Sequence, residues 1–401
     1  MKKQLMVLTA LLLCGGAQAA AGPDPARKAA ERAGTIALKF HQKAASRSGN
    51  LFFSPYSLYS AFAMVYDGAR GQTIAQMAGV FGFPMLRGDL RRDVALLRDQ
   101  LAKSAGDSEF NQANAFWYQK DYEFLPEYMD ALKSDYAAAA VASDFNKDPE
   151  AVRLAANAWT EKQTKGKIKD LFAASSFSPG TRLVLVNAVY FKGKWKEQFD
   201  KKATREQDFT LLSGKKIKAP LMESSGEIGV GYYEDSFLQA AALPYAGGDL
   251  EMLVLLPKPG KNFLETEKGM TAEKFAKVRS GLANKEVKVF LPRFSLADDW
   301  DLAPALSALG MPQPFAYPGA DFRGMNGKKD LFVQKAVQKA FVEVNEEGTE
   351  AAAATAIAMM PGSAPSPGQP IVFRADRPFV FLIEDSRTGL ILFMGRLADP
   401  R

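Results

Sequence analysis

The spacing of apolar residues predicts helices in the N-terminal third of the chain. Residues 25–45 place apolar side chains three or four positions apart, as one buried helix face requires, at Ala29, Ala33, Ile36, Ala37 and Phe40. Residues 57–67 repeat this spacing after Pro55. Residues 148–164 begin with Asp148 and Pro149, which is typical of an N-cap followed by the first turn of a helix.

A different pattern begins near residue 182. Residues 183–191 form an apolar, β-branched run that is too continuous for a half-exposed strand, so it predicts a strand buried on both faces. Residues 386–389, Ser-Arg-Thr-Gly, predict a hairpin turn. Further apolar runs occupy residues 250–256, 287–291, 341–344, 379–383 and 390–394. Helices followed by strands, without regular βαβ alternation, indicate an α+β fold with large mixed or antiparallel sheets.

Residues 346–370 fit neither class. They contain alanines around a threonine and then Pro361, Pro365, Pro367 and Pro370, so we expect an exposed loop with a function of its own. At a period of two, one side carries Thr349, Ala351, Ala353, Thr355, Ile357 and Met359. The side chains are small, and no proline precedes Pro361, so the segment could slide between two strands and become a strand itself.

The N-terminus has the order of a secretory signal peptide. Two lysines precede an apolar stretch, residues 5–13, which is too short to span a bilayer and is followed by small residues ending at Ala19. We expect cleavage after Ala19, or after Ala21, and secretion to the periplasm or the cell exterior. Cys14 would leave with the signal; a lipoprotein that keeps Cys14 remains an alternative, although Leu13 is bulky for that site.

The rest of the chain, residues 20–401, is expected to form one domain. Apolar residues make up 47% of the sequence and no linker interrupts them. Removing Lys2 and Lys3 lowers the charge from +6 to 49 minus 45, or +4, which does not indicate a nucleic-acid partner. Two lysine clusters could bind a polyanion or simply form solvated edges: Lys162, Lys165, Lys167 and Lys169, and Lys192, Lys194, Lys196, Lys201 and Lys202.

A hydrolase is poorly supported by the available side chains. A Ser/His/Asp triad would have to use His41, the single histidine, and no Gly-x-Ser-x-Gly motif is present. Ser213 to Lys216 satisfies Ser-x-x-Lys, and residues 387–389 resemble the Lys-Thr-Gly motif of penicillin-recognising enzymes, but both lie in predicted turns. One histidine and no mature cysteine also argue against zinc, disulfides and thiolate chemistry, so no cofactor is expected.

The loop carries a resemblance to a known family. Its start resembles the reactive-centre hinge of inhibitory serpins: Glu346, Glu347, Gly348, Thr349, Glu350, Ala351, Ala352, Ala353, Ala354 and Thr355. Other serpin-like segments follow in the family's order over almost the whole chain, at residues 50–57, 187–195, 243–245, 291–294 and 377–383. The chain thus resembles a secreted, bacterial-type inhibitory serpin, which implies the serpin fold with residues 346–370 exposed as bait.

The resemblance implies a suicide inhibitor rather than an enzyme. A target serine protease, or a cysteine protease, attacks the bait bond, and the loop inserts into the central sheet before the acyl-enzyme hydrolyses. Counting seventeen residues from Glu346 places the bond at Gly362-Ser363, with Met360 and Met359 as alternatives. A glycine there suggests an elastase-like or subtilisin-like target that tolerates small residues.

The resemblance also assigns two groups of gating residues. The breach, where insertion begins, is expected to contain an ion pair between Glu346 and Arg293 beside Trp195. The shutter, beneath the centre of the sheet, is expected to contain Ser54, Ser57, Asn187 and Gln338. Because Gln338 stands where the family usually has histidine, sheet opening should show no histidine-like pH dependence. Each of these residues could instead have only a structural role.

Two alternatives remain within the same fold. The chain could be a non-inhibitory binding or chaperone-like serpin, although its small hinge residues favour inhibition. It could also be cleaved as a substrate without trapping the protease if insertion is slow. In either case we expect a monomer that has no membrane association once the signal is removed.

Overall fold

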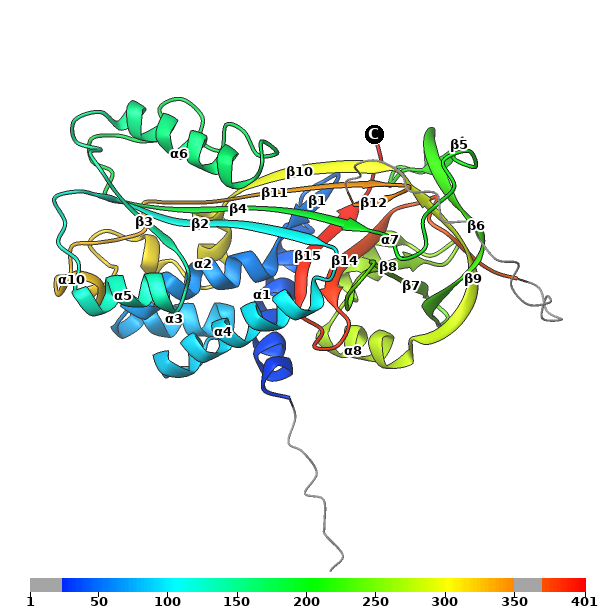
Figure 1. The fold of residues 1–401 in the computed structure, drawn as a ribbon, viewed down its shortest axis with the longest axis horizontal. Helices are drawn as coiled ribbons and strands as arrows, with labels where there is room; N and C mark the ends of the chain where they lie inside the picture. The colour runs from blue at the N-terminus through cyan, green and yellow to red at the C-terminus, as the bar shows by residue number, and fades with distance from the viewer. Residues whose placement is uncertain (1–23, 350–369) are drawn as a thin grey trace, which may run out of the picture.

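The computed structural model describes residues 24–349 and 370–401. The molecule has an α+β architecture in which a six-stranded sheet lies between two layers of helices (Figure 1). Helices α1 to α5 lie on one face of this sheet, and α6 lies across the opposite face (Figure 1). A nine-stranded sheet packs at one end of the molecule (Figure 1). The fold class therefore agrees with the sequence-based expectation.

The helices of the described part are separated by strands from the N-terminal region onward. In chain order they are α1 (Pro25–Ala44), α2 (Pro55–Gly68), α3 (Gly71–Phe81), α4 (Arg87–Ser104), α5 (Pro126–Ser134), α6 (Pro149–Gln163), α7 (Phe263–Lys268), α8 (Ala272–Gly281), α9 (Leu302–Ala308), the 3-10 helix η1 (Gln313–Phe315) and α10 (Arg323–Asn326).

The six-stranded sheet has the order β10-β11-β12-β4-β2-β3, and β11 also pairs directly with β4. Its strands are β2 (Glu109–Gln119), β3 (Ala139–Ser143), β4 (Leu183–Lys194), β10 (Phe294–Asp301), β11 (Lys335–Asn345) and β12 (Gly348–Thr349). The nine-stranded sheet has the order β1-β15-β14-β8-β7-β6-β9-β13, with β5 paired to β6. Its strands are β1 (Leu51–Phe53), β5 (Arg205–Thr210), β6 (Lys216–Glu234), β7 (Leu238–Pro244), β8 (Leu250–Pro257), β9 (Ala283–Pro292), β13 (Ile371–Arg374), β14 (Phe379–Asp385) and β15 (Ile391–Leu397).

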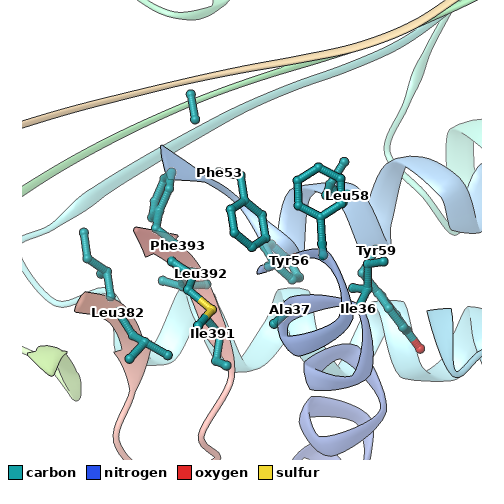
Figure 2. Close-up of a cluster of buried hydrophobic side chains, with 14 of the residues drawn as sticks. Ile36, Ala37, Phe53, Tyr56, Leu58, Tyr59, Leu382, Ile391, Leu392 and Phe393 are labelled. Carbon is teal, nitrogen blue, oxygen red and sulfur yellow. The ribbon is translucent and has the colours of Figure 1, made fainter. Parts of the chain in front are cut away.

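Helix α2 lies at the centre of the hydrophobic core. All 14 of its residues are buried, so the helix is enclosed on every side rather than on one stripe. Figure 2 shows side chains of α1, α2 and β15 meeting beside the end of β1, among them Ile36, Tyr56, Leu58, Leu392 and Phe393. This packing fixes the N-terminus of α2 directly beneath the six-stranded sheet.

Several elements agree closely with the sequence-based predictions. The apolar face of α1 is buried, and the Asp148 carboxylate accepts the Ala151 amide at 2.9 Å as the N-cap of α6. In β4, residues 183–191 are all buried, as a strand covered on both faces requires. The chain turns between β14 and β15 at residues 386–389, as the turn chemistry predicted.

The expectation of helices first and strands later was incomplete. Strand β2 and strand β3 alternate with the helices before residue 150. The polar residues Asn111, Gln112 and Asn114 break the apolar pattern of β2, although the strand pairs with β4 along most of its length. Two of these side chains, both partly buried, hydrogen-bond beneath the sheet, which explains why an inner strand of the sheet carries them.

Candidate functional site

The chain turns back after β11 and enters the six-stranded sheet as β12. Thr349 pairs with Val344 of β11 on one side and with Gly193 of β4 on the other, and both pairings are antiparallel. Further along, β4 and β11 pair directly and in parallel, from Lys335 opposite Val184 to Phe341 opposite Tyr190. Strands β4 and β11 are therefore separated by β12 at one end of the sheet and pair directly with each other further along.

Gly348 allows this entry into the sheet. Its φ of +150° lies in a region that favours glycine, and a Cβ built on it would lie 2.0 Å from the Gly193 carbonyl oxygen. A side chain at this position would collide with the backbone of β4. Close approach of the chain to β4 therefore depends on glycine at position 348.

An ion pair holds the residue that precedes the turn. Arg293 donates to the Glu346 carboxylate, and the Thr204 hydroxyl donates to the same carboxylate at 2.7 Å. Burial alone would raise the pKa of Glu346, but the hydrogen bonds from Arg293 and Thr204 outweigh it and hold the pKa below its ordinary value. The Glu346 side chain is 3% exposed whereas that of Arg293 is 49% exposed. If the pair were broken, the arginine could be solvated by water, but the carboxylate would remain buried without a counter-charge.

Trp195 lies beside this ion pair and binds the same segment through its backbone and its ring. Its amide donates to the Glu347 carbonyl and its indole donates to the Asn345 carbonyl, both at 2.9 Å. The indole stacks on Tyr245 with ring centroids 4.7 Å apart and an interplanar angle of 9°. The structure thus brings the three expected breach residues together.

Thr349 points into the core, where its hydroxyl lies 2.8 Å from the hydroxyl of Tyr245. Both residues are buried, and burial raises the pKa of the Tyr245 phenol far above its ordinary value, so the phenol stays protonated. Lys201 forms an ion pair with Glu347. No local signal identifies Tyr245, Thr204 or Lys201 as neighbours of the hinge, since all three lie more than 100 positions earlier in the chain.

The expectation of an exposed loop from Glu346 onward is wrong for its first four residues. Glu346, Glu347, Gly348 and Thr349 are all buried. The backbone of Gly348 and Thr349 finds strand partners on both sides, and each buried polar side chain finds a partner in the protein. These pairings make burial favourable where the composition suggested an open loop.

The expected shutter residues also form one network. The side-chain amide of Gln338 pairs with the backbone of Ser54: its oxygen accepts the Ser54 amide at 2.9 Å, and its nitrogen donates to the Ser54 carbonyl at 3.0 Å. The same nitrogen donates to the Asn187 side-chain oxygen at 2.6 Å. Gln338 lies on β11 and Asn187 lies directly opposite on β4, so this bond crosses the line where the two strands would separate.

Asn187 continues the network to α2 and β2. Its amide nitrogen lies 2.5 Å from the Ser57 hydroxyl and 2.5 Å from the Asn114 side-chain oxygen. Gln112 donates to the Ser57 hydroxyl at 3.0 Å, and Ser54 donates to the Leu392 carbonyl at 2.6 Å. Asn114 and Gln112 were missed in the sequence because they lie on the strand whose pattern was not recognised.

The matches to known proteins agree with this arrangement. A profile of the family described as Serpin (serine protease inhibitor) matches residues 31–400. The chain belongs to the serpin family. It is 40% identical over 376 residues to Serpin B6 of Macaca fascicularis, covering 92% of this chain and 99% of that protein. It is 39% identical over 360 residues to the leukocyte elastase inhibitor of Homo sapiens, covering 88% of this chain and 94% of that protein.

A solved serpin structure shows the same fold. The crystal structure of Serpin48, described as a highly specific serpin of the insect Tenebrio molitor, has a TM-score of 0.81 at 28% identity. The match covers 94% of this serpin and 99% of Serpin48. Together with the named protease inhibitors among its relatives, the family supports a non-catalytic inhibitor rather than an enzyme.

Helix α6 and the segment after it cover the outer face of the sheet in this serpin (Figure 1). Ile168 is buried against Ala113 of β2 and Ala188 of β4, with Phe341 of β11 packed beside them. Lys339 of β11 donates to the Lys169 carbonyl at 2.9 Å. Any strand that enters between β4 and β11 must pass beneath these contacts.

Part of the expected site lies outside the described residues of the serpin. This holds for the remaining hinge residues and for every candidate for the bait bond: Glu350, Ala351, Ala352, Ala353, Ala354, Thr355, Met359, Met360, Gly362 and Ser363. The signal peptide with Ala19 and Cys14 also lies outside them. These assignments therefore remain predictions.

The described residues offer little for other chemistry. Within residues 24–349 and 370–401, no three His, Cys, Asp or Glu side chains are grouped to hold a metal ion, and no helix is long and apolar enough to cross a membrane. His41 is buried at the end of α1, where its Nε2 lies 3.2 Å from the Glu267 carboxylate. In the lysine clusters, Lys165 and Lys169 form ion pairs with Glu109 and Glu161.

Proposed function

We propose that this serpin is a single-use inhibitor of serine proteases that traps its target by inserting the cleaved loop between β4 and β11. The observation that carries the proposal is the pairing of β12 with both strands at once. The first two residues of the inserting strand are then already in place in the uncleaved chain. Insertion would extend an existing strand rather than nucleate a new one.

The register of β12 supports this path. Thr349 lies opposite Val344 and Gly193, and the direct pairing of β11 with β4 has the same offset, with Gln338 opposite Asn187. An antiparallel strand that continues from Thr349 can therefore pair with both neighbours without any sliding of β4 along β11. The seven direct pairs from Lys335–Val184 to Phe341–Tyr190 would be exchanged for two antiparallel ladders.

If the inserted strand continued that register, Thr355 would lie between Gln338 and Asn187. Parting β4 and β11 by one strand moves these two side chains about 4.8 Å further apart and breaks their bond of 2.6 Å. Thr355 has the same parity as the inward-pointing Thr349, so its hydroxyl would face the two separated amides. The Thr355 hydroxyl could then hydrogen-bond to both Gln338 and Asn187, which would no longer reach each other.

The alternate positions face α6. After insertion in the same register, Ala354 would lie level with Ala188 and Lys339, close to where Ile168 packs on the sheet. A large side chain there would meet the segment that follows α6. Alanine at this position lets the strand pass beneath that segment with little displacement.

The trapping reaction uses the nucleophile of the target. The hydroxyl oxygen of the protease attacks the carbonyl carbon of the bait residue, the following amide nitrogen leaves with a proton, and an ester joins the two proteins. Water would ordinarily hydrolyse this ester. Insertion carries the acylated end along the sheet, so the protease is displaced and its catalytic geometry is lost before water attacks.

The sequence supports more specific assignments. Gly362-Ser363 is the proposed bait bond, which favours elastase-like or subtilisin-like proteases that accept small residues. The N-terminal segment supports export, with cleavage near Ala19 and inhibition of a protease in the periplasm or outside the cell.

The proposal is tested by mixing the mature serpin with elastase-, subtilisin- and chymotrypsin-like proteases and analysing the products by denaturing gels and mass spectrometry. A complex that resists SDS is expected, and the released C-terminal peptide identifies the bait bond. Cleavage without a complex but with a large rise in melting temperature would indicate insertion too slow to trap. Cleavage with neither result would refute the inhibitory function.

A further inference from the structure

A cavity of about 520 Å³ lies on the helical side of the molecule, away from the breach. It is formed where the C-terminus of α2 meets the starts of α3, α4 and α5 and the short helix α10. Three arginines contribute to its wall, together with a buried aspartate and two exposed apolar side chains: Arg70, Arg87, Arg91, Asp67, Met85 and Leu86. Nothing in the inhibitory mechanism uses this cavity.

The charges in the cavity are only partly compensated. Arg91 is neutralised by Asp67, which accepts two of its hydrogen bonds, and it also lies 3.3 Å from Asp135. Within the described part of the chain, neither Arg70 nor Arg87 forms an ion pair. Arg70 donates to the carbonyls of Asp67 and Ala69, and Arg87 donates to the same Asp67 carbonyl at 3.3 Å.

Arg70 is held in place by its surroundings. A Cβ built on Gly324 would lie 2.3 Å from the guanidinium carbon of Arg70, so the planar group rests directly against the glycine of α10. Burial lowers the pKa of Arg70, and the like charge of Arg87 lowers it further. The nearby Asp67 and Asp321 charges act in the opposite direction on the pKa of Arg70, but among the described residues neither carboxylate forms an ion pair with Arg70 or Arg87.

The start of α4 adds further hydrogen-bond donors. Leu86 provides no side-chain cap for this 18-residue helix, and Gly88 of its first turn lines the cavity. The first backbone N–H groups of a helix have no partner within the helix, and the positive end of the helix dipole favours an anion there. Glu127 is the remaining acidic side chain among the lining residues, and with Asp67 it leaves the net charge of the wall positive against three arginines.

We infer that this cavity binds a small oxyanion, a phosphate or carboxylate group, between Arg70 and Arg87. Guanidinium groups present paired N–H donors that match the oxygens of either anion. Met85 and Leu86 are 63% and 69% exposed at the cavity, which suits a ligand whose anionic group carries a short apolar portion. The inference does not depend on the proposed inhibitory function.

The competing explanation is that both arginines serve only as caps. Their acceptors are carbonyls at the C-terminal end of α2, where cationic side chains stabilise a helix without any ligand. A cap requires no anion, so the two explanations differ in whether added anions stabilise the protein.

The test measures thermal unfolding of the intact chain during titration with inorganic phosphate and, separately, with acetate, at constant ionic strength. Ligand binding to the folded state raises the melting temperature with a saturable dependence on concentration. Saturation by phosphate alone would indicate a phosphate ligand, and saturation by acetate at equal or lower concentration would indicate a carboxylate ligand. Absence of saturation with both anions would overturn the inference.

Two variants and a control distinguish a specific anion-binding site from a general effect of the positive charge of the protein. Arg87→Gln should weaken the apparent affinity by about tenfold or more. Gly324→Ala leaves the charge unchanged but should displace the Arg70 guanidinium, and it should weaken binding as well. Arg92→Gln removes a charge from the exposed side of the same helix, where Arg92 pairs with Asp89, and it should leave affinity unchanged. Equal effects of Arg87→Gln and Arg92→Gln would refute a specific site.

Discussion

Replacing Thr349 by glutamate should convert the serpin from an inhibitor into a substrate. Thr349 is fully buried. Within the described residues, its hydroxyl forms a hydrogen bond with one side chain, the protonated phenol of Tyr245. A glutamate would place a carboxylate in that position without a cationic partner. The carboxylate must then stay buried and unpaired, become protonated, or leave the sheet together with Gly348.

The magnitudes favour departure from the sheet. Leaving a charge buried without its partner costs about 3 to 5 kcal/mol. Keeping Gly348 and Thr349 inserted is worth on the order of four backbone hydrogen bonds at a net ~0.5 to 1.5 kcal/mol each. Before cleavage, the penalty for burying the glutamate and the gain from these hydrogen bonds are comparable. After cleavage, the loop can insert only if the glutamate is buried at the first step, so the whole penalty adds to the barrier. A penalty of about 3 kcal/mol would slow that step roughly a hundredfold.

The assay uses a protease that forms an SDS-resistant complex with the unaltered serpin. For Thr349→Glu we expect normal cleavage, little complex, and a cleaved product whose melting temperature does not rise. Thr349→Ser keeps the hydroxyl and provides the matched control, which should trap normally. If Thr349→Glu traps the protease as efficiently as the unaltered chain, insertion does not proceed through the β12 position and the reasoning is wrong.

Three further predictions follow from the shutter and the nine-stranded sheet. Thr355→Val should leave the uncleaved chain unchanged but reduce the stability gained on cleavage by about 1 to 3 kcal/mol, measured by denaturant unfolding, because Gln338 and Asn187 lose their replacement partner. Since glutamine does not titrate, the rate of loop insertion, followed by stopped-flow fluorescence after acylation, should show no inflection near pH 6.5, whereas Gln338→His should introduce one across about pH 5.5–8; acylation is excluded because the target's own histidine titrates in that range. Burial and the Glu384 charge on the adjacent strand raise the pKa of Glu251 to about 7. The folded chain therefore holds this proton more tightly than the unfolded chain, and the free energy of unfolding falls as pH rises from the ordinary pKa of a glutamate to about 7. Glu251→Gln should remove that loss and add about 1 to 3 kcal/mol at pH 8 in thermal unfolding, with no gain at pH 4.

The elements that the sequence predicted well are those with a local signal. The burial of Ile36 and Phe40 in α1 follows from their spacing, and the cap at Asp148 follows from its position before Pro149. Strand β4 was predicted because a strand buried on both faces is apolar at successive positions, without alternation of polar and apolar side chains. In each case the physical cause lies within a few residues of its effect.

The elements that were missed depend on distant partners. Polar residues interrupt β2 because Asn114 and Gln112 bind Asn187 and Ser57, which no local pattern reveals. The burial of the first hinge residues likewise depends on Arg293, Thr204 and Tyr245, which other parts of the chain provide. The resemblance identified the hinge, but composition alone indicated an exposed loop where the structure has the start of a strand.

The shared register of β4, β11 and β12 divides the loop into a part of fixed length and a part that can vary. Six steps along the chain separate Thr349, opposite Val344, from Thr355, which the proposed insertion would bring level with Gln338 in the same register. One added residue between them would reverse the alternation after the insertion, turning Thr355 toward α6 and a neighbouring alanine toward the core, while Thr349 would keep its place. A recognition sequence for a different protease could therefore be built into the distal part of the loop without rebuilding the sheet that receives it.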